Sequence, residues 1–204
     1  MEPCTQTFTK SRTKQKKLII LDRDGVINED SDNYIRSVDQ WIPIPGSIEA
    51  IARLSRVGFQ VAVATNQSGL ARGYFTMNDL KAMHDKMIHL IVEQGGQLSD
   101  IYFCPHGPDD HCRCRKPSPG MMEQIIEKTQ ADPSETWVVG DSLRDLEAGQ
   151  SAQCKTALVL TGKGGITQSI LNEKRQCGNV TRIGNTPVFE NLAHFTEELL
   201  SEGI

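Results

Sequence analysis

No apolar run in the 204-residue sequence approaches the length of a membrane-spanning helix. A basic excess is also missing, since the formal net charge is −4 and the pI is about 5.7. Basic residues are not interleaved with aromatic ones, so nothing indicates a nucleic-acid partner. A secretory signal needs an apolar core of roughly 7–15 residues, and here only residues 18–21 are apolar before Asp22. We therefore expect a cytoplasmic protein with no membrane and no nucleic-acid partner.

Disulfide pairs are not expected, because the six cysteines are spread unevenly through a long chain without a secretory signal. Three of them share one loop with a histidine, and the four side chains are Cys104, His106, Cys112 and Cys114. Three cysteines and one histidine are the ligands of a structural zinc site, and four protein ligands leave no open position for catalysis. His111 in the same loop could replace His106 as the ligand. The alternative is that these cysteines lie together in a buried loop by coincidence.

The composition favours one folded domain, because 38% of the residues are hydrophobic and 24% are charged. Residues 1–16 form a basic tail, either solvated or anion-binding, and the domain covers residues 17–204. Five apolar runs are typical of buried strands: residues 18–21, 59–64, 101–103, 136–140 and 156–160. Amphipathic helical segments alternate with these runs. The alternation predicts an α/β fold with a Rossmann-like parallel sheet and helices on both faces.

Capping residues and glycines predict where several helices begin and end. Ser47 is expected to be the N-cap of a helix that ends at Gly58. Thr76 is expected to cap a helix that continues to about residue 94. Near the end of the chain, residues 188–200 have the pattern of one helix.

Polar side chains follow four of the predicted strands. Asp22 and Asp24 come directly after the first strand, and side chains two positions apart in an extended segment point the same way. Two carboxylates this close repel each other unless a cation lies between them, and Mg²⁺, which prefers oxygen ligands, would hold both ionised. The other three loops carry Thr65 and Asn66, Arg115 and Lys116, and Asp141. Ligands of open α/β sheets bind beyond the carboxyl ends of the strands, so we expect a site there.

In this order and at these places, the polar residues resemble those of the haloacid dehalogenase superfamily. The similarity covers roughly residues 17–165, and its strongest parts are Leu21-Asp22-Arg23-Asp24-Gly25 and residues 138–145. No cap domain is inserted between the first strand and the end of the cysteine loop, so loops must cover the site. An aspartate at position 24, in place of an apolar or aromatic residue, points to phosphoryl transfer rather than dehalogenation. The resemblance therefore implies a capless phosphatase that acts on a small phosphate ester.

The resemblance also implies a role for each of these residues. Asp22 would attack phosphorus and form an aspartyl-phosphate, while Asp24 would protonate the leaving alkoxide and later activate water. Thr65 and Lys116 would stabilise the transferring phosphoryl oxygens. Mg²⁺ would be held by the Asp22 carboxylate, the backbone carbonyl of Asp24 and the Asp141 carboxylate.

Two residues after the fourth predicted strand leave alternatives open. Asp145 either supports the metal, through water or through Lys116, or is an ordinary acid in the first turn of a helix. Ser142 stands where some relatives carry a substrate-binding lysine, which leaves that contact and the preferred anomer open.

The loop that ends in Cys-Arg-Lys-Pro narrows the resemblance to two groups, the heptose-bisphosphate phosphatases and the histidinol-phosphate phosphatases. Residues 65–73, Thr-Asn-Gln-Ser-Gly-Leu-Ala-Arg-Gly, are similar to the first group, which acts in lipopolysaccharide-core biosynthesis. The second group tends to have an aspartate where Ser68 stands. The alternatives are a histidinol-phosphate phosphatase, a broader sugar-phosphate phosphatase, and a zinc-stabilised binding module without catalysis. The intact set of catalytic residues argues against the binding module.

The expected partner is a small phosphosugar, and we expect the protein to be a monomer. By resemblance, the substrate contacts map onto three loops, at Asp30, Ser31, Asp32, Asn33, Asn66, Gln67, Ser68 and Arg115. The Arg115 guanidinium could meet a second, non-reacting phosphate, since its fork matches phosphate oxygens. We therefore expect Arg115→Ala to raise KM for a bisphosphate more than KM for a monophosphate.

Overall fold

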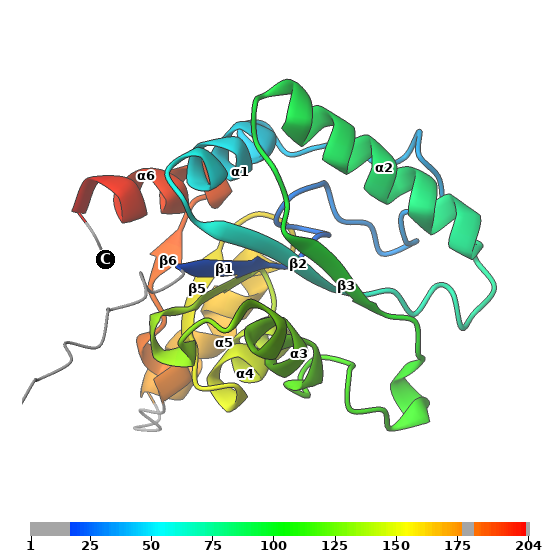
Figure 1. Ribbon diagram of the computed structural model, residues 1–204. Helices are drawn as coiled ribbons and strands as arrows, with labels where there is room; N and C mark the ends of the chain where they lie inside the picture. Colours follow the sequence, from blue (N-terminus) through cyan, green and yellow to red (C-terminus); the bar gives the residue numbers. More distant parts are fainter. Residues whose placement is uncertain (1–16, 177–181, 203–204) are drawn as a thin grey trace, which may run out of the picture.

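In residues 17–176 and 182–202, which the computed structural model describes, six parallel strands form one sheet (Figure 1). The strands are β1 Leu18–Leu21, β2 Gln60–Asn66, β3 Asp100–Cys104, β4 Trp137–Gly140, β5 Lys155–Val159 and β6 Val188–Phe189. Their spatial order is β3-β2-β1-β4-β5-β6. β1 therefore lies between β2 and β4, which brings the residues after these three strands to the same edge of the sheet. The predicted basic tail lies outside the described residues.

Helices cover both faces of the sheet (Figure 1). They are α1 Ser47–Arg56, α2 Met77–Glu93, α3 Gly120–Thr129, α4 Leu143–Ser151, α5 Gly164–Gln176 and α6 Leu192–Glu202. α1, α2 and α6 lie on one face, and α3, α4 and α5 lie on the other. The α/β class and the Rossmann-like arrangement are thus confirmed. None of these described helices is long and apolar enough to cross a membrane.

The two sides of β1 contribute to different halves of the core. Ile19 and Leu21 are fully buried among side chains of α1, α2 and α6, whereas Leu18 and Ile20 are fully buried among side chains of α3 and α4. Successive side chains of a strand point to opposite faces of the sheet, so a strand between two helical layers needs an apolar residue at every position. This explains the unbroken apolar run before Asp22.

The beginning of α1 differs from the prediction. Ser47 is the first helical residue rather than the N-cap, and Gly46 occupies the N-cap position with a φ angle of 82°. The Ser47 hydroxyl donates a hydrogen bond to the Ile27 carbonyl at 2.7 Å, so it fastens the helix to the loop after β1 instead of capping it. The prediction for Thr76 is confirmed, because Thr76 and Asp79 form a capping box at the start of α2.

The prediction of one helix over residues 188–200 is wrong at its beginning. Val188 and Phe189 form β6, which pairs with the end of β5, and α6 begins only at Leu192. Two apolar residues beside an open sheet edge gain hydrogen bonds as a strand, and apolar periodicity alone cannot distinguish so short a strand from a helix end. α5 has no counterpart among the predicted elements.

Candidate active site

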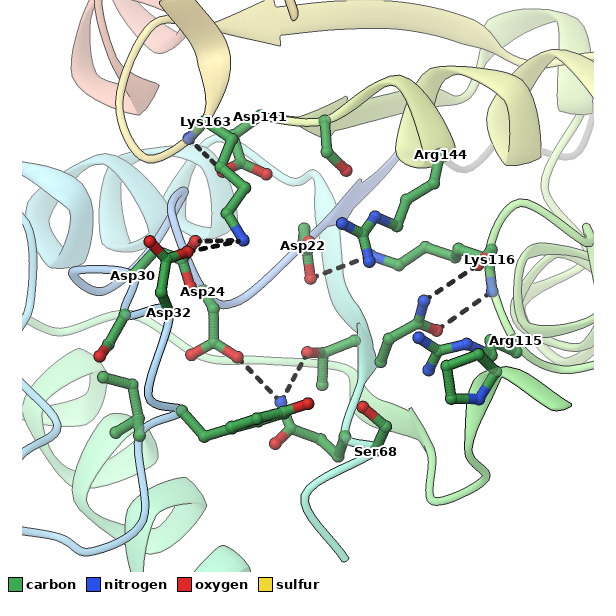
Figure 2. A pocket seen from close by; sticks show the side chains of 18 of the residues that line it. Asp22, Asp24, Asp30, Asp32, Ser68, Arg115, Lys116, Asp141, Arg144 and Lys163 are labelled. Carbon is green, nitrogen blue, oxygen red and sulfur yellow. Dashed lines mark hydrogen bonds and ion pairs between the residues drawn. The ribbon is translucent and has the colours of Figure 1, made fainter. Parts of the chain in front are cut away.

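Asp22 and Asp24 follow the carboxyl end of β1, in the middle of the sheet edge. The backbone N–H of Asp22 donates to the Val139 carbonyl at 3.0 Å, which prolongs the pairing of β1 with β4. Gly25 then turns the chain with a φ angle of +84°. Both carboxylates line a cavity of about 220 Å³, which Figure 2 shows from close by. The site therefore lies where the sheet topology predicts it.

Lys116 is a buried cation in this cavity, with an exposure of 2%. Its Nζ lies 2.9 Å from Asp22 Oδ1 and 2.6 Å from Asp145 Oδ1. The Asn66 amide holds the Lys116 backbone, since it accepts from the Lys116 N–H at 3.1 Å and donates to the Lys116 carbonyl at 3.0 Å. The predicted substrate contact Asn66 thus uses its amide to position Lys116. Burial between two carboxylates keeps the lysine charged, because each of them stabilises the ammonium group.

Asp145 both pairs with the lysine of the cavity and caps a helix. One of its oxygens pairs with Lys116. The other oxygen accepts from the Ser142 N–H at 3.0 Å and from the Ser142 hydroxyl at 2.5 Å, which caps the start of α4. Asp145 is fully buried. It is therefore both a first-turn acid and the partner of the site lysine, and the Ser142 hydroxyl is occupied by this cap.

The Asp24 carboxylate is held by donors from three side chains. The Arg23 Nη2 group lies 2.7 and 2.8 Å from its two oxygens, Asn28 Nδ2 donates at 2.9 Å, and Gln67 Nε2 donates at 3.0 Å. Burial by itself raises the pKa of Asp24, but the charge of Arg23 and the hydrogen bonds bring this pKa below its ordinary value. Gln67 also donates to the Thr65 hydroxyl at 2.9 Å, so it links two of the predicted catalytic residues (Figure 2).

Arg23 is itself buried, with an exposure of 1%, and its Nη1 lies 3.5 Å from His84 Nε2. Because a guanidinium can only donate, this histidine nitrogen accepts. Burial and the charge of Arg23 lower the pKa of His84 to about 4. His84 is therefore neutral near pH 7 and packs beside the Phe103 ring.

A cluster of carboxylates provides the ligands for a cation. Asp22, Asp141 and Asp145 can each place one carboxylate oxygen within 4.8 Å of the others. Burial raises the pKa of Asp22 to about 8 despite the nearby lysine, and burial together with Asp145 raises the pKa of Asp141 to about 7. A divalent cation would offset this crowding of negative charge, and oxygen atoms are the ligands that Mg²⁺ prefers. Both oxygens of Asp145 are occupied, one by Lys116 and the other by Ser142, so Asp22 and Asp141 fit the metal best.

Two glycines let the loops after β1 and β5 approach Asp141. A Cβ atom on Gly25 or on Gly162 would lie 2.2 Å from Asp141 Oδ2. The Lys163 N–H donates to this same oxygen at 2.7 Å, and the Thr161 hydroxyl donates to the Gly25 carbonyl at 2.6 Å. The other oxygen of Asp141 accepts no hydrogen bond from the residues that the structure describes. It therefore remains available to a metal ion.

The four predicted zinc ligands come together. Cys104 Sγ lies 3.6 Å from Cys112 Sγ and 3.3 Å from Cys114 Sγ, and His106 Nδ1 lies 3.3 Å from Cys114 Sγ. Zn–S bonds of about 2.3 Å in a tetrahedron give sulfur–sulfur distances of about 3.8 Å, close to those observed. His111 is not part of the group, so His106 is the histidine that fits. The cluster can hold a metal ion, and its loop leads directly into the lysine of the cavity.

Most predicted substrate contacts line the cavity, and these are Asp30, Ser31, Asp32, Asn66, Gln67, Ser68 and Arg115. Asn33 does not line this cavity, and it lines a neighbouring cavity with Glu29 and Arg36. The physical reason is a turn, in which the Tyr34 N–H donates to the Ser31 carbonyl at 3.0 Å. This turn places Tyr34, rather than Asn33, at the cavity.

Several side chains that the sequence does not single out also line the cavity, among them Tyr34, Arg72, Arg144 and Lys163. Lys163 Nζ lies 3.3 Å from Asp30 and 3.6 Å from Asp32, so it ties the loop after β5 to the loop after β1 (Figure 2). Lys163 lies in the loop after β5. The rule that ligands bind beyond the carboxyl ends of the strands singled out the other loops, and it could have singled out this one as well. Arg144 lies within a helix, where no sequence signal distinguishes it from a surface arginine.

Known proteins with similar sequence and structure indicate the family of this chain. The HAD-hydrolase-like family model matches residues 113–192. A D-glycero-beta-D-manno-heptose-1,7-bisphosphate 7-phosphatase from Pseudomonas aeruginosa is 60% identical over 149 residues, which cover 73% of this chain and 84% of that protein. The protein of the same name from Neisseria meningitidis serogroup A is 52% identical over 186 residues, which cover 91% of this chain and 96% of that protein.

A similar solved structure is the D,D-heptose 1,7-bisphosphate phosphatase from B. bronchiseptica, complexed with magnesium and phosphate. Its TM-score is 0.83 at 49% sequence identity, and the match covers 91% of this chain and 99% of that chain. From these similarities and from the family model, we conclude that the chain belongs to the haloacid-dehalogenase-like hydrolases.

Proposed function

We propose that the protein is a Mg²⁺-dependent phosphatase that removes the 7-phosphate of D-glycero-D-manno-heptose 1,7-bisphosphate. The observation that carries the proposal is the position of Lys116 Nζ, 2.9 Å from Asp22, at a sheet edge that also holds Asp141. The names of the similar proteins support the substrate. The magnesium and phosphate in the similar structure support the cofactor and the reaction.

In the first step, an Asp22 oxygen attacks phosphorus, and the bond between phosphorus and the sugar oxygen breaks. The Lys116 ammonium group and the Thr65 hydroxyl stabilise the phosphoryl oxygens, and Asp24 gives its proton to the leaving alkoxide. Asp22, Asp141 and the Asp24 carbonyl would hold Mg²⁺, which would offset the negative charge between nucleophile and phosphate. The step leaves an aspartyl-phosphate on Asp22 and a free sugar hydroxyl.

In the second step, Asp24 takes a proton from a water molecule that attacks the aspartyl-phosphate, so that Asp22 is restored and inorganic phosphate leaves. The low pKa of Asp24 in the free protein, which Arg23 maintains, suits this base role. The acid role needs a higher pKa, and a phosphate dianion bound beside Asp24 would raise it, because a neighbouring negative charge favours the neutral carboxyl.

The test is a phosphate-release assay with Mg²⁺, in which the heptose bisphosphate and histidinol phosphate are compared. We expect the bisphosphate to be the better substrate and Asp22→Asn to be inactive, since asparagine keeps the shape of the side chain but removes the nucleophile. Asp85→Asn, an exposed carboxylate on α2, is the matched control and should keep full activity. A preference for histidinol phosphate would reject the substrate, and an active Asp22→Asn would reject the mechanism.

We further propose that the cluster of Cys104, His106, Cys112 and Cys114 binds a structural Zn²⁺ ion that fixes the loop before Lys116. Chelation of zinc should abolish phosphate release, and added Zn²⁺, but not excess Mg²⁺, should restore it. Cys112→Ser should lower the bound zinc, whereas replacement of the buried Cys154 by alanine should leave it at one ion per chain. Full activity of zinc-free protein would contradict this role.

We also propose that residues 17–204 form a single domain and that the protein acts as a cytoplasmic monomer on a small phosphosugar. Light scattering of the purified protein should then give the mass of one chain, 22.6 kDa. A mass that is a multiple of this value would reject the monomer.

A further inference from the structure

Arg23 lies behind the catalytic cavity rather than in it. Its side chain is buried and is not among those that line the cavity. The Nε group donates to Asp24 Oδ1 at 3.0 Å, and Nη2 lies 2.7 Å from Oδ1 and 2.8 Å from Oδ2. Two of the three guanidinium nitrogens therefore hold the carboxylate that the proposed mechanism uses as acid and base.

The third guanidinium nitrogen of Arg23 faces helix α2. Its Nη1 lies 3.5 Å from His84 Nε2, and within residues 17–176 and 182–202 no other group accepts a hydrogen bond from it. Since the guanidinium group donates, Nε2 accepts, and the neutral ring carries its proton on Nδ1. The planar guanidinium group is thus held at both ends, by Asp24 at one end and by His84 at the other.

His84 belongs to the buried face of α2. Met83 and Met87, one position before it and three after it, are fully buried in the core, and the His84 ring packs beside the Phe103 ring. A polar side chain in such a place needs a polar partner. The partner of His84 is Arg23, so the packing of α2 fixes where the far end of the guanidinium group lies.

We propose that His84 is a positioning residue for the phosphatase reaction, in that it orients the Arg23 guanidinium group, which in turn directs the Asp24 carboxylate toward the leaving oxygen. This inference rests on the proposed function, because it takes Asp24 as the acid of the first step. A rigid planar fork transmits the orientation of one end to the other. A small misplacement of a reacting group slows the reaction steeply. α2 thus affects the chemistry although none of its residues lines the cavity.

The test compares two replacements of His84. Leucine removes the acceptor, whereas the side-chain oxygen of glutamine accepts in place of Nε2. With heptose 1,7-bisphosphate, His84→Leu should lower kcat roughly tenfold and leave KM within about twofold, because His84 does not line the substrate cavity. His84→Gln should restore most of this loss. His89→Leu, on the exposed face of α2, is the matched control and should behave as the unmodified protein does.

A second measurement locates the loss in proton transfer. p-Nitrophenyl phosphate releases a phenolate that needs no proton near pH 7, so kcat/KM for this ester should fall less in His84→Leu than kcat/KM for the bisphosphate. Arg23→Lys keeps the charge but lacks the planar fork, and it should show the same difference between the two esters. Adding His84→Leu to Arg23→Lys should lower kcat/KM by less than about twofold more, because the route through the arginine is already broken.

Unchanged kcat in His84→Leu, a rise in KM alone, or a loss that His84→Gln does not restore would overturn the role of His84. Losses of equal size on the two esters would overturn the link to the acid, and additive losses in the double variant would overturn the route through Arg23. No phosphate release from the bisphosphate by the unmodified protein would instead overturn the proposed function. Thermal melting verifies that each variant is folded at the assay temperature.

Discussion

At the scale of single residues, burial gives two neighbouring aspartates opposite properties. Asp22 shares the buried Lys116 with Asp145, and burial raises the pKa of Asp22 to about 8. Asp24 is the carboxylate that pairs with the buried Arg23, and the pKa of Asp24 is lowered. A buried charge is tolerated only with a partner of opposite charge. Which aspartate is ionised therefore depends on whether it has a buried cation of its own or shares one. The sequence Asp-Arg-Asp therefore holds one aspartate whose pKa is raised and one whose pKa is lowered.

Replacement of Lys116 by methionine should lower kcat by roughly 10²- to 10³-fold, since it removes the positive charge beside the phosphoryl oxygens. Methionine keeps much of the length of the lysine stem, so the loss reports the charge. The measurement is phosphate release at saturating substrate. Lys128→Met, which changes an exposed lysine of α3, should behave as the unmodified protein does. A Lys116→Met variant within threefold of that protein would contradict the role of the lysine.

Protonation of His84 should lower the stability of the fold at acidic pH. Its pKa is about 4 in the folded protein and 6.5 ordinarily, so between these values the unfolded chain binds the proton more strongly. The stability that neutral His84 contributes is complete above pH 6.5 and is lost as the pH falls toward 4, to a total of about 3 kcal/mol. His84→Gln should therefore lose less Tm between pH 7 and pH 5 than the unmodified protein. His89→Gln, on the exposed face of α2, is the control, and equal losses in all three proteins would refute the expectation.

At the scale of elements, the loops after the strands determine the geometry of the site. The loops after β1 and β5 touch through Gly25 and Gly162, and a side chain at either position would occupy the place of the Asp141 carboxylate. The cysteine loop places Lys116 at the cavity, and the Asn66 side chain at the end of β2 forms two hydrogen bonds with the Lys116 backbone. Short contacts between loops thus replace a cap domain in shaping the cavity.

Gly25→Ala and Gly58→Ala make a matched pair. Both glycines have positive φ angles, +84° and +95°, so alanine should cost each variant roughly 1–2 kcal/mol of stability. Only at Gly25 would the new Cβ lie 2.2 Å from Asp141 Oδ2, whereas nothing lies within 4 Å at Gly58. We therefore expect Gly25→Ala alone to need far more Mg²⁺ for activity. Mg²⁺ titrations of phosphate release that coincide for the two variants would show that the close approach is unimportant.

At the scale of the whole molecule, the parallel sheet concentrates negative charge at one edge. Asp22 and Asp141 follow the adjacent strands β1 and β4, and burial raises the pKa of the first to about 8 and of the second to about 7. Between about pH 4 and pH 8 the folded state binds these protons more strongly than the unfolded chain does. The metal-free protein should therefore lose stability as the pH rises through this range.

Mg²⁺ should reverse this loss, because the ion binds the ionised carboxylates and only to the folded state. The rise in Tm on addition of Mg²⁺ should consequently be larger at pH 8 than at pH 5, as measured by scanning calorimetry. Asp141→Asn should show little rise at either pH. A rise that is the same at both pH values would count against a metal site made of Asp22 and Asp141.

Local patterns of the sequence predicted much of the fold and of the site. The apolar run before Asp22 predicted a strand buried on both sides, and the cysteine spacing predicted the cluster that could hold a metal. Errors arose where a local pattern fits two structures. Ser47 is a good N-cap residue, but its hydroxyl binds Ile27. Residues 188–200 have the pattern of one helix, but Val188 and Phe189 form β6.

The sequence by itself determined five of the six strands in the described residues, which loops carry charge and which ligands could bind zinc, because strand periodicity, turn chemistry and ligand spacing act over a few residues. Only the tertiary structure decided that Asp145 pairs with Lys116, that Lys163 ties two loops together and that Arg144 stands beside Arg115. These relations depend on the order of strands in the sheet, and that order is set by the packing of segments far apart in the chain.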